Sequence, residues 1–198
     1  MVKEVAFVVP GDLATPTGGY AYDRRIIAEL RSAGWNVQVL DIGEGFPRPT
    51  AAARAAAQRR IAELSGERAI VIDGLAFGAL AEEAQALAPG RRLVALVHHP
   101  LALETGLSAG QSAALRDSER AALTCARHVI ATSPSTARLL VADYAVSPDR
   151  LSIVRPGTDR VAARWYRVVC QINPARCTAI FSPCPMYQAA SWSHTNTG

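Results

Sequence analysis

Short apolar runs alternate along this chain with longer segments in which apolar residues recur at helical spacing. A continuous apolar run of strand length is typical of a parallel strand that is buried on both faces. Such runs predict strands at residues 5–10, 37–42, 69–73, 93–97, 129–132 and 151–154. The segments between them predict helices at residues 20–33, 50–64, 77–87, 111–126 and 135–144. Because this alternation requires crossover connections, the sequence predicts an α/β fold with a doubly wound, Rossmann-like parallel sheet.

The alternating pattern stops near residue 160, where the composition also changes. Residues 161–198 contain no acidic residue, two of the three tryptophans and three of the four cysteines. They show no clear period beyond a short stretch at residues 165–169. We therefore expect a Rossmann-like domain over residues 1–160 and an irregular tail over residues 161–198. The tail reads like an out-of-frame translation.

Composition and charge exclude several classes of protein. A hydrophobic content of 49% with 19% charged residues is that of a globular protein. The net charge of +4 comes from Arg160, Arg164, Arg167 and Arg176, so residues 1–159 are neutral and make a poor nucleic-acid surface. No apolar run approaches the roughly 20 residues of a transmembrane helix. Since the N-terminus also lacks the pattern of a signal peptide, we expect a cytoplasmic protein.

The cysteines do not indicate a metal site. Cys125 falls in a predicted helix, where we expect a buried small hydrophobic residue. Cys170, Cys177 and Cys184 are seven residues apart, which is neither the close pairing of a zinc site nor an even-numbered disulfide framework. We interpret their regular spacing as coincidence.

Gly18 and Gly19 follow the first predicted strand and stand directly before a helix. Paired glycines let the backbone approach a ligand, and a helix N-terminus offers free N–H groups to an anion. The GxGxxG fingerprint of dinucleotide-binding folds is absent, however. From the residues alone, a tight turn explains the two glycines equally well.

His98 and His99 follow the fourth predicted strand. A histidine at the carboxyl end of a central strand can bind a hydroxyl group or transfer a proton. Adjacent strand residues point to opposite faces, so the two should not bind one metal ion together. No cysteine or acidic cluster lies near them in the sequence, and we expect no metal here. One packed and one solvated histidine is the simpler interpretation.

Other polar residues near strand ends have ordinary structural explanations. We expect a helix cap or loop role for Asp41, a turn at Asp73-Gly74, a solvated helix face at Glu119 and a helix N-cap at Ser133.

Three segments together carry a family resemblance: TPTGGYAYDRRIIAELRSAGWNVQVL, LVHHPLALETGL and SERAALTCARHVIATSPSTARLLVADYAVSPDRLSIVRPGTD. Over about residues 5–159 the chain resembles the N-terminal half of retaining glycosyltransferases of family 4. Proteins of that family have the GT-B fold, which consists of two Rossmann-like domains. The third segment is the most specific, since its predicted helix, strand and closing turn are all in register.

The resemblance implies a reaction and roles for individual residues. A sugar would pass from a nucleotide-sugar donor to an acceptor hydroxyl with anomeric retention, and no cofactor is implied. Gly18 and Gly19 would face the donor diphosphate, and His98, rather than His99, would approach the sugar ring. The acceptor side would include His99. The loop at residues 101–110 would contribute Leu101, Glu104 and Thr105 to it.

The chain also departs from the family pattern. A second domain in the family supplies an Arg and a Lys for the diphosphate and an E-x7-E segment, and residues 161–198 match none of these. We therefore expect a truncated or frameshifted product that is inactive alone or needs a separate donor-domain partner. A freestanding sugar- or nucleotide-binding module stays open, and a nucleotide-cofactor oxidoreductase is disfavoured by the missing glycine fingerprint. Tail residues could cover the exposed cleft or drive self-association, namely Trp165, Tyr166, Val168 and Val169.

Overall fold

The computed structural model describes residues 3–65, 67–157, 167–169 and 178–180. The chain divides into two compact units, Met1–Pro156 and Gly157–Gly198. In the second unit, β7 (Arg167–Val169) pairs antiparallel with β8 (Thr178–Ile180). The predictions for Trp165, Tyr166 and the tail cysteines lie outside the described residues, as do those for the side chains of Val168 and Val169.

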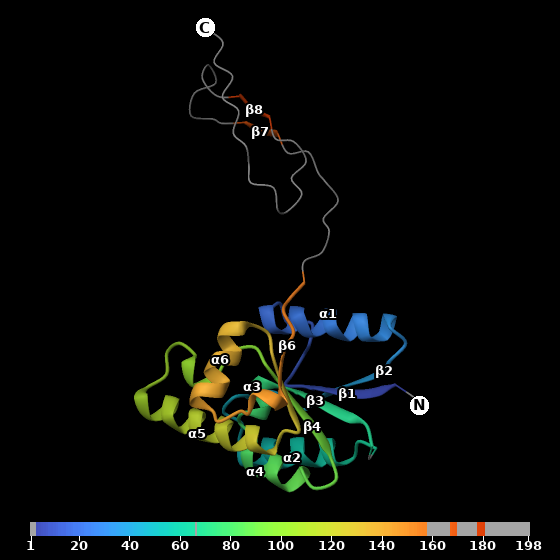
Figure 1. The fold of residues 1–198 in the computed structure, drawn as a ribbon, viewed down its shortest axis with the longest axis vertical. Helices are drawn as coiled ribbons and strands as arrows, with labels where there is room; N and C mark the ends of the chain where they lie inside the picture. Colours follow the sequence, from blue (N-terminus) through green and yellow to red (C-terminus); the bar gives the residue numbers. More distant parts are fainter. Residues whose placement is uncertain (1–2, 66, 158–166, 170–177, 181–198) are drawn as a thin grey trace. The chain divides into compact units, whose positions relative to one another are not determined.

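The first unit contains a sheet of six parallel strands in the order β2-β1-β3-β4-β5-β6 (Figure 1). Every strand expected from an apolar run is present, and the Rossmann-like parallel sheet is confirmed. The order reverses between β1 and β3, because β2 lies beyond β1 on one side and all later strands follow on the other. The strands are β1 (Glu4–Val9), β2 (Asn36–Asp41), β3 (Ala69–Asp73), β4 (Arg92–Val97), β5 (His128–Ala131) and β6 (Leu151–Ile153).

Helices cover the two faces of the sheet unequally. On one face lies α1 (Gly18–Ser32), whose residues Ile26, Ile27 and Leu30 pack with the β1 side chains of that face. The other face carries the larger core cluster and most of the helices (Figure 1). These helices are α2 (Ala51–Ala62), α4 (Ala81–Leu87), α5 (Ala109–Cys125) and α6 (Pro134–Asp143). Cys125 is partly buried and packs against that core, so it is less buried than expected.

The single helix expected at residues 77–87 is wrong in its bounds, because the chain forms two helices there. The first, α3 (Gly74–Phe77), begins directly after β3 because the Asp73 side chain accepts a hydrogen bond from the Leu75 N–H at 2.7 Å. The chain then passes under the loop after β4 at Gly78, where a Cβ atom would lie 2.7 Å from the Leu101 side chain. The helix resumes only at α4.

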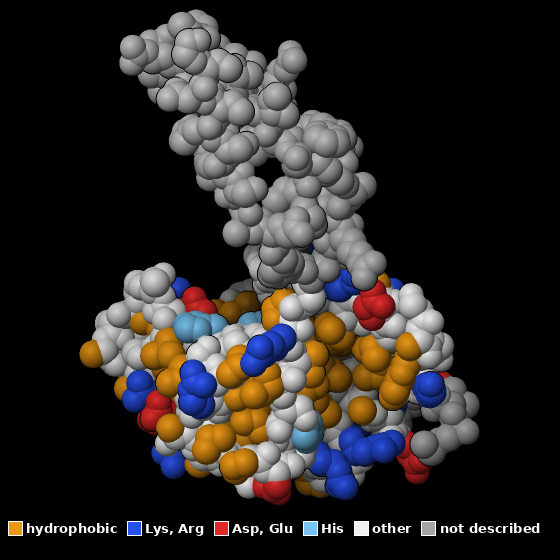
Figure 2. All heavy atoms as spheres, turned by 45° about the horizontal axis from the view of Figure 1, so that its top comes forward, with side chains coloured by type: hydrophobic (Ala, Val, Ile, Leu, Met, Phe, Trp, Pro, Cys, Tyr) orange, Lys and Arg blue, Asp and Glu red, His pale blue; other side chains and the backbone are white. Residues whose placement is uncertain are grey.

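The face that carries α1 retains exposed apolar surface over the later strands. Val71 and Ile130 are only partly buried there, and the exposed fraction of Val154, which follows β6, is 37%. Figure 2 brings this side forward and shows hydrophobic side chains gathered over it. No helix among the described residues has the length and apolar character that crossing a membrane requires.

Candidate functional site

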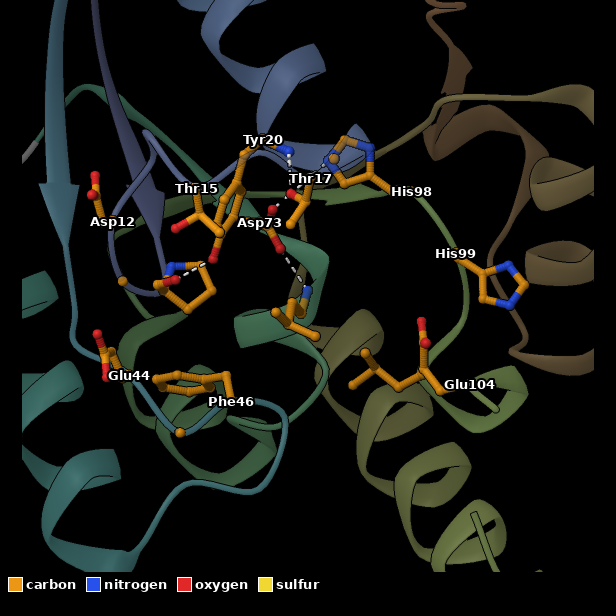
Figure 3. A pocket seen from close by; sticks show the side chains of 16 residues that line it. Asp12, Thr15, Thr17, Tyr20, Glu44, Phe46, Asp73, His98, His99 and Glu104 are labelled. Carbon is orange, nitrogen blue, oxygen red and sulfur yellow. Dashed lines mark hydrogen bonds and ion pairs between the residues drawn. The ribbon is translucent and has the colours of Figure 1, made fainter. Parts of the chain in front are cut away.

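A pocket of about 560 Å³ lies at the carboxyl ends of the central strands, where the strand order reverses (Figure 3). In open α/β sheets this is the usual position of a ligand site. The loop after β1 and the start of α1 form one wall, and residues that follow β2, β3 and β4 form the rest. The pocket therefore gathers four segments that are distant in the sequence.

The structure brings most of the residues singled out in the sequence to this pocket. Five of them line it: Gly19, His98, His99, Leu101 and Glu104. Gly18 and Thr105 are not among the lining residues. Gly18 is the first residue of α1, beside Gly19, and Thr105 is an exposed residue of the loop after β4.

The N-terminus of α1 is open towards a ligand. Thr17 caps the helix, since its side chain accepts a hydrogen bond from the Tyr20 N–H at 3.2 Å. The N–H groups of Gly18 and Gly19 have no hydrogen-bond acceptor within the described part of the chain. A Cβ atom on Gly19 would lie 3.4 Å from the His98 ring, so this glycine allows the helix start and the imidazole to approach closely.

His98 is held firmly at the end of β4. Its carbonyl oxygen accepts hydrogen bonds from the hydroxyls of Thr132 and Thr136, at 3.4 and 3.2 Å. The ring of Tyr22 meets the imidazole edge to face, with centroids 5.2 Å apart. The exposed fraction of the His98 side chain is 23%, whereas His99 is exposed. One packed and one solvated histidine is therefore what the structure contains.

Two buried carboxyl groups face the His98 imidazole. Its Nε2 atom lies 3.1 Å from Oδ1 of Asp23, on α1, and 3.7 Å from Oδ2 of Asp73, at the end of β3. Both aspartates are buried. No acidic cluster lies near the histidines in the sequence, but the fold brings two acids to them, from 75 and 25 positions away from His98.

The close charges change the protonation of this cluster. Burial, together with the charge of Asp23 and a hydrogen bond to it, raises the pKa of Asp73 to about 7. Burial alone would lower the pKa of His98, but the hydrogen bond to Asp23 and the charges of Asp23 and Asp73 outweigh it and raise that pKa. The cluster therefore retains protons near neutral pH.

The same three residues are of types that bind metal ions, and their ligand atoms lie within 4.8 Å of one another. The imidazole nitrogen that faces the carboxylates is already engaged by Asp23, however. We interpret the group as a hydrogen-bonded ion pair with a second carboxyl beside it, rather than as a metal centre.

The pocket is acidic. Four of the residues that line it carry carboxyl groups, namely Asp12, Glu44, Asp73 and Glu104. None of the described lining residues is a lysine or an arginine. Tyr20 also lines it and donates its hydroxyl hydrogen to the Pro10 carbonyl. Burial and the nearby aspartates raise the pKa of Tyr20 to about 12, so the phenol stays neutral. Such a lining suits hydroxyl groups better than a polyphosphate.

Glu119 was expected on a solvated helix face, and this was wrong. Its exposed fraction is 1%, and its Oε2 atom accepts a hydrogen bond from the Leu101 N–H at 2.9 Å. Burial raises its pKa to about 7, opposed by that hydrogen bond. The interpretations of Ser133 and Asp41 are confirmed. Ser133 caps α6, and Asp41 accepts from the N–H groups of Gly11 and Gly43 in adjacent loops.

Sequence reasoning missed Asp23 and took Asp73 only for a turn residue. Asp23 did leave a signal, since it lies three and four positions before Ile26 and Ile27 on the apolar stripe of its helix. An acid in such a stripe indicates a buried charge with a partner. Asp73 gave no comparable signal, because a strand-ending Asp-Gly is common in turns.

Comparison with known families agrees with this architecture. The family model described as Glycosyltransferase Family 4 matches residues 16–161, which include the start of α1, Asp23, Asp73 and the histidine pair. Comparison with curated proteins gives no match. The family match covers most of the 198-residue chain. The chain thus belongs to glycosyltransferase family 4.

Proposed function

We propose that this domain takes part in transferring a hexosyl group from a nucleotide-sugar to an acceptor hydroxyl, with retention of the anomeric configuration. The observation that carries the proposal is the pocket at the reversal of strand order, where the start of α1 and a firmly held histidine meet. Membership of the family supports the reaction class. The bond from the anomeric carbon to the diphosphate oxygen breaks, and a bond to the acceptor oxygen forms. The acceptor proton leaves with the departing diphosphate.

On the donor side, the proposal assigns the free N–H groups of Gly18 and Gly19 to oxygens of the diphosphate. These groups sit at the positive end of the α1 dipole and lack other acceptors among the described residues. His98 lies against Gly19, so a sugar attached to that diphosphate would come within reach of the imidazole. We assign His98 to a hydrogen bond with a hydroxyl of the transferred sugar.

On the acceptor side, we assign the loop that follows β4. His99, Leu101 and Glu104 line the pocket from this loop, and Thr105 lies next to Glu104. The carboxylate of Glu104 can accept hydrogen bonds from acceptor hydroxyls, while Leu101 offers an apolar contact. The loop would therefore select the acceptor by its pattern of hydroxyl groups.

The charge of the pocket supports a further part of the proposal, that a separate donor-binding domain completes the site. Stabilising the departing diphosphate requires fixed positive charge or many donors. The described lining offers carboxylates and two histidines but no lysine or arginine. We therefore propose that the cationic groups come from a second domain that closes over this face.

The test is reconstitution. The 198-residue chain would be assayed for release of nucleoside diphosphate from a panel of nucleotide-sugars and polyhydroxyl acceptors, with and without a separately produced donor domain from family 4. We expect turnover only with the partner, and its loss in His98→Ala. His128→Ala is the matched control, because that histidine bonds to Ser152 away from the pocket. Turnover by the chain alone, or undiminished turnover with His98→Ala, would contradict the proposal.

A freestanding binding module is the second candidate, and one observation favours it. The core cluster beneath the sheet is complete within residues 6–146, so this domain has the buried apolar interior of an independently folded unit. Equilibrium binding of simple sugars or nucleotides by the chain alone, unaffected by a donor domain and without turnover, would select this function.

A further inference from the structure

We propose that Asp23 and Asp73 act as a buried carboxyl pair that holds His98 in one orientation and as an imidazolium, leaving its Nδ1–H as a fixed hydrogen-bond donor for a ligand oxygen. The two aspartates are thus positioning residues, which act on the ligand only through the histidine. The assignment of that oxygen to a hydroxyl of the transferred sugar rests on the proposed function. The protonation state and the orientation of the histidine do not depend on that function.

The two aspartates contact the His98 ring at one of its nitrogen atoms. Nε2 of His98 faces a carboxylate oxygen of Asp23 at 3.1 Å and one of Asp73 at 3.7 Å, and these acceptors favour a hydrogen on this nitrogen. The two acids come from different elements, α1 and the end of β3, and they fix the ring from one edge. Gly19 lies on the same side of the ring, since a Cβ atom added to it would be 3.4 Å from Cδ2. Nδ1 has no hydrogen-bond partner among the described residues and remains available.

One oxygen atom of the carboxyl pair lacks a partner among the described residues. Oδ2 of Asp23 is buried and has no hydrogen-bond partner in the described part of the chain. A buried carboxylate oxygen without a partner is costly. A proton shared with Asp73 would satisfy it, and two carboxyl groups in such close proximity do not both ionise readily. Burial and the neighbouring Asp23 already raise the pKa of Asp73 to about 7.

Charge balance then decides the state of the histidine. With one proton between the two carboxyl groups, the pair has a single negative charge, and an imidazolium makes the cluster neutral. A neutral imidazole would leave a net negative charge buried beneath the pocket. The neutral cluster is the one that a buried site favours.

The remaining titratable groups around the cluster do not change this balance. Tyr20 and Tyr22, both on α1, face it, and burial raises the pKa of each, so both stay uncharged. Asp41, the last residue of β2, is near enough to act on Tyr20 and adds negative charge on that side. No lysine or arginine among the described residues forms an ion pair with either aspartate. The positive charge that balances the carboxyl pair is therefore favoured only on the His98 imidazole.

The test is a histidine titration by ¹H–¹⁵N NMR on the full 198-residue chain, without any substrate. Signals would be assigned with His98→Gln and His99→Gln, and the ring nitrogen shifts report both tautomer and protonation. We expect His98 to keep its proton to higher pH than the histidines of the same chain unfolded in urea. Asp23→Asn and Asp73→Asn should each lower the pH at which His98 titrates.

Two outcomes would overturn the proposal: His98 titrating no higher than the histidines of the urea-unfolded chain, or titrating unchanged in both Asn variants. A titration that changes on treatment with EDTA and is restored by zinc would overturn it in favour of a metal site. Thermal melting by circular dichroism verifies that each variant is folded, and the wild-type curve stays decisive if one of them is not. Because no substrate is used, failure of sugar transfer would leave this result standing.

Discussion

Glu119 and Leu101 are joined by a buried hydrogen bond, in which the carboxylate of a mid-helix residue accepts the backbone N–H of a pocket residue at 2.9 Å. Glu119 belongs to α5, and Leu101 begins the short helical turn after β4. The contact ties the proposed acceptor loop to the helix layer beneath the sheet. Glu119 therefore holds a pocket residue in place, although it does not line the pocket itself.

Glu119→Gln should change how stability depends on pH. The pKa of Glu119 is about 7 in the folded chain, above the roughly 4.3 of an unfolded glutamate. The folded state then binds more protons between these values, so this group lowers the free energy of unfolding as pH rises through that window. Asp73, also with a raised pKa, acts in the same direction and remains in the variant.

The free energy of unfolding would be measured with urea at pH 5 and pH 8. We expect a smaller loss between the two pH values in Glu119→Gln than in the wild type, because Gln can still accept from the Leu101 N–H. Glu63→Gln is the matched control, since that glutamate is exposed at the end of α2 and is not among the charges that act on Glu119. An equal loss in Glu119→Gln and wild type would show that the carboxyl is not protonated in the folded chain.

Gly19→Ala and Gly18→Ala should distinguish an effect on the ligand site from an effect on the stability of α1. Neither glycine has a positive φ, so Ala is compatible with both positions and should stabilise the helix start by about 0.5–1 kcal/mol. At Gly18 the added methyl meets nothing within 4 Å, whereas at Gly19 it contacts the His98 ring at 3.4 Å. We expect both variants to fold.

Only Gly19→Ala should impair turnover in the reconstituted assay, by on the order of tenfold, or about 1.4 kcal/mol. Release of nucleoside diphosphate measures the effect, and thermal melting measures stability. Equal turnover in the two variants would show that turnover does not require the backbone at Gly19 to approach a ligand closely.

Gly74→Ala should destabilise the domain. A Cβ atom there would lie 2.9 Å from the Leu96 carbonyl oxygen and 3.2 Å from Cα of Val97, both backbone atoms of β4. Overpacking of this kind costs about 1–3 kcal/mol. Gly110→Ala, in the first turn of α5 with open space around it, is the control and should be neutral or slightly stabilising. If urea unfolding showed the two variants to be equally stable, α3 would not pack as tightly on β4 as described.

The strands could be predicted because a parallel strand buried on both faces needs a continuous apolar run, and that requirement is local. The same holds for the cap at Ser133, where side chain and partner N–H lie three residues apart. The break between α3 and α4 was not predicted from the apolar spacing of residues 77–87; Gly78 keeps helical angles, and the backbone leaves them at Leu80, where φ is −116° and ψ is 42°.

The residues of the candidate site also fall into those that the sequence predicts and those that it does not. His98 was identified because its position, the end of a central strand, follows from the strand pattern. Its two acidic partners were not, since their contact depends on how α1 and β3 meet across the sheet. Glu119 looked solvated because its neighbours in sequence are polar, yet the turn at Leu101 covers it.

Thr132 and Thr136 should prove energetically coupled through His98. Both hydroxyls donate to the same His98 carbonyl oxygen, at 3.4 and 3.2 Å, and both threonines are buried. Thr132→Val or Thr136→Val alone leaves one donor in place, so each should cost about 0.5–1.5 kcal/mol. The double variant leaves the carbonyl with neither hydroxyl, and its cost should exceed the sum of the two by about 0.5 kcal/mol or more.

The free energies come from urea unfolding of the four proteins in this cycle. Thr124→Val is the control, because that exposed threonine donates only within its own helix and should change stability little. The histidine titration adds an independent readout, since a carbonyl released from both hydroxyls frees the end of β4 and loosens the imidazole against Asp23. Strict additivity, with an unchanged His98 titration in the double variant, would mean that the two aspartates alone hold the histidine in place.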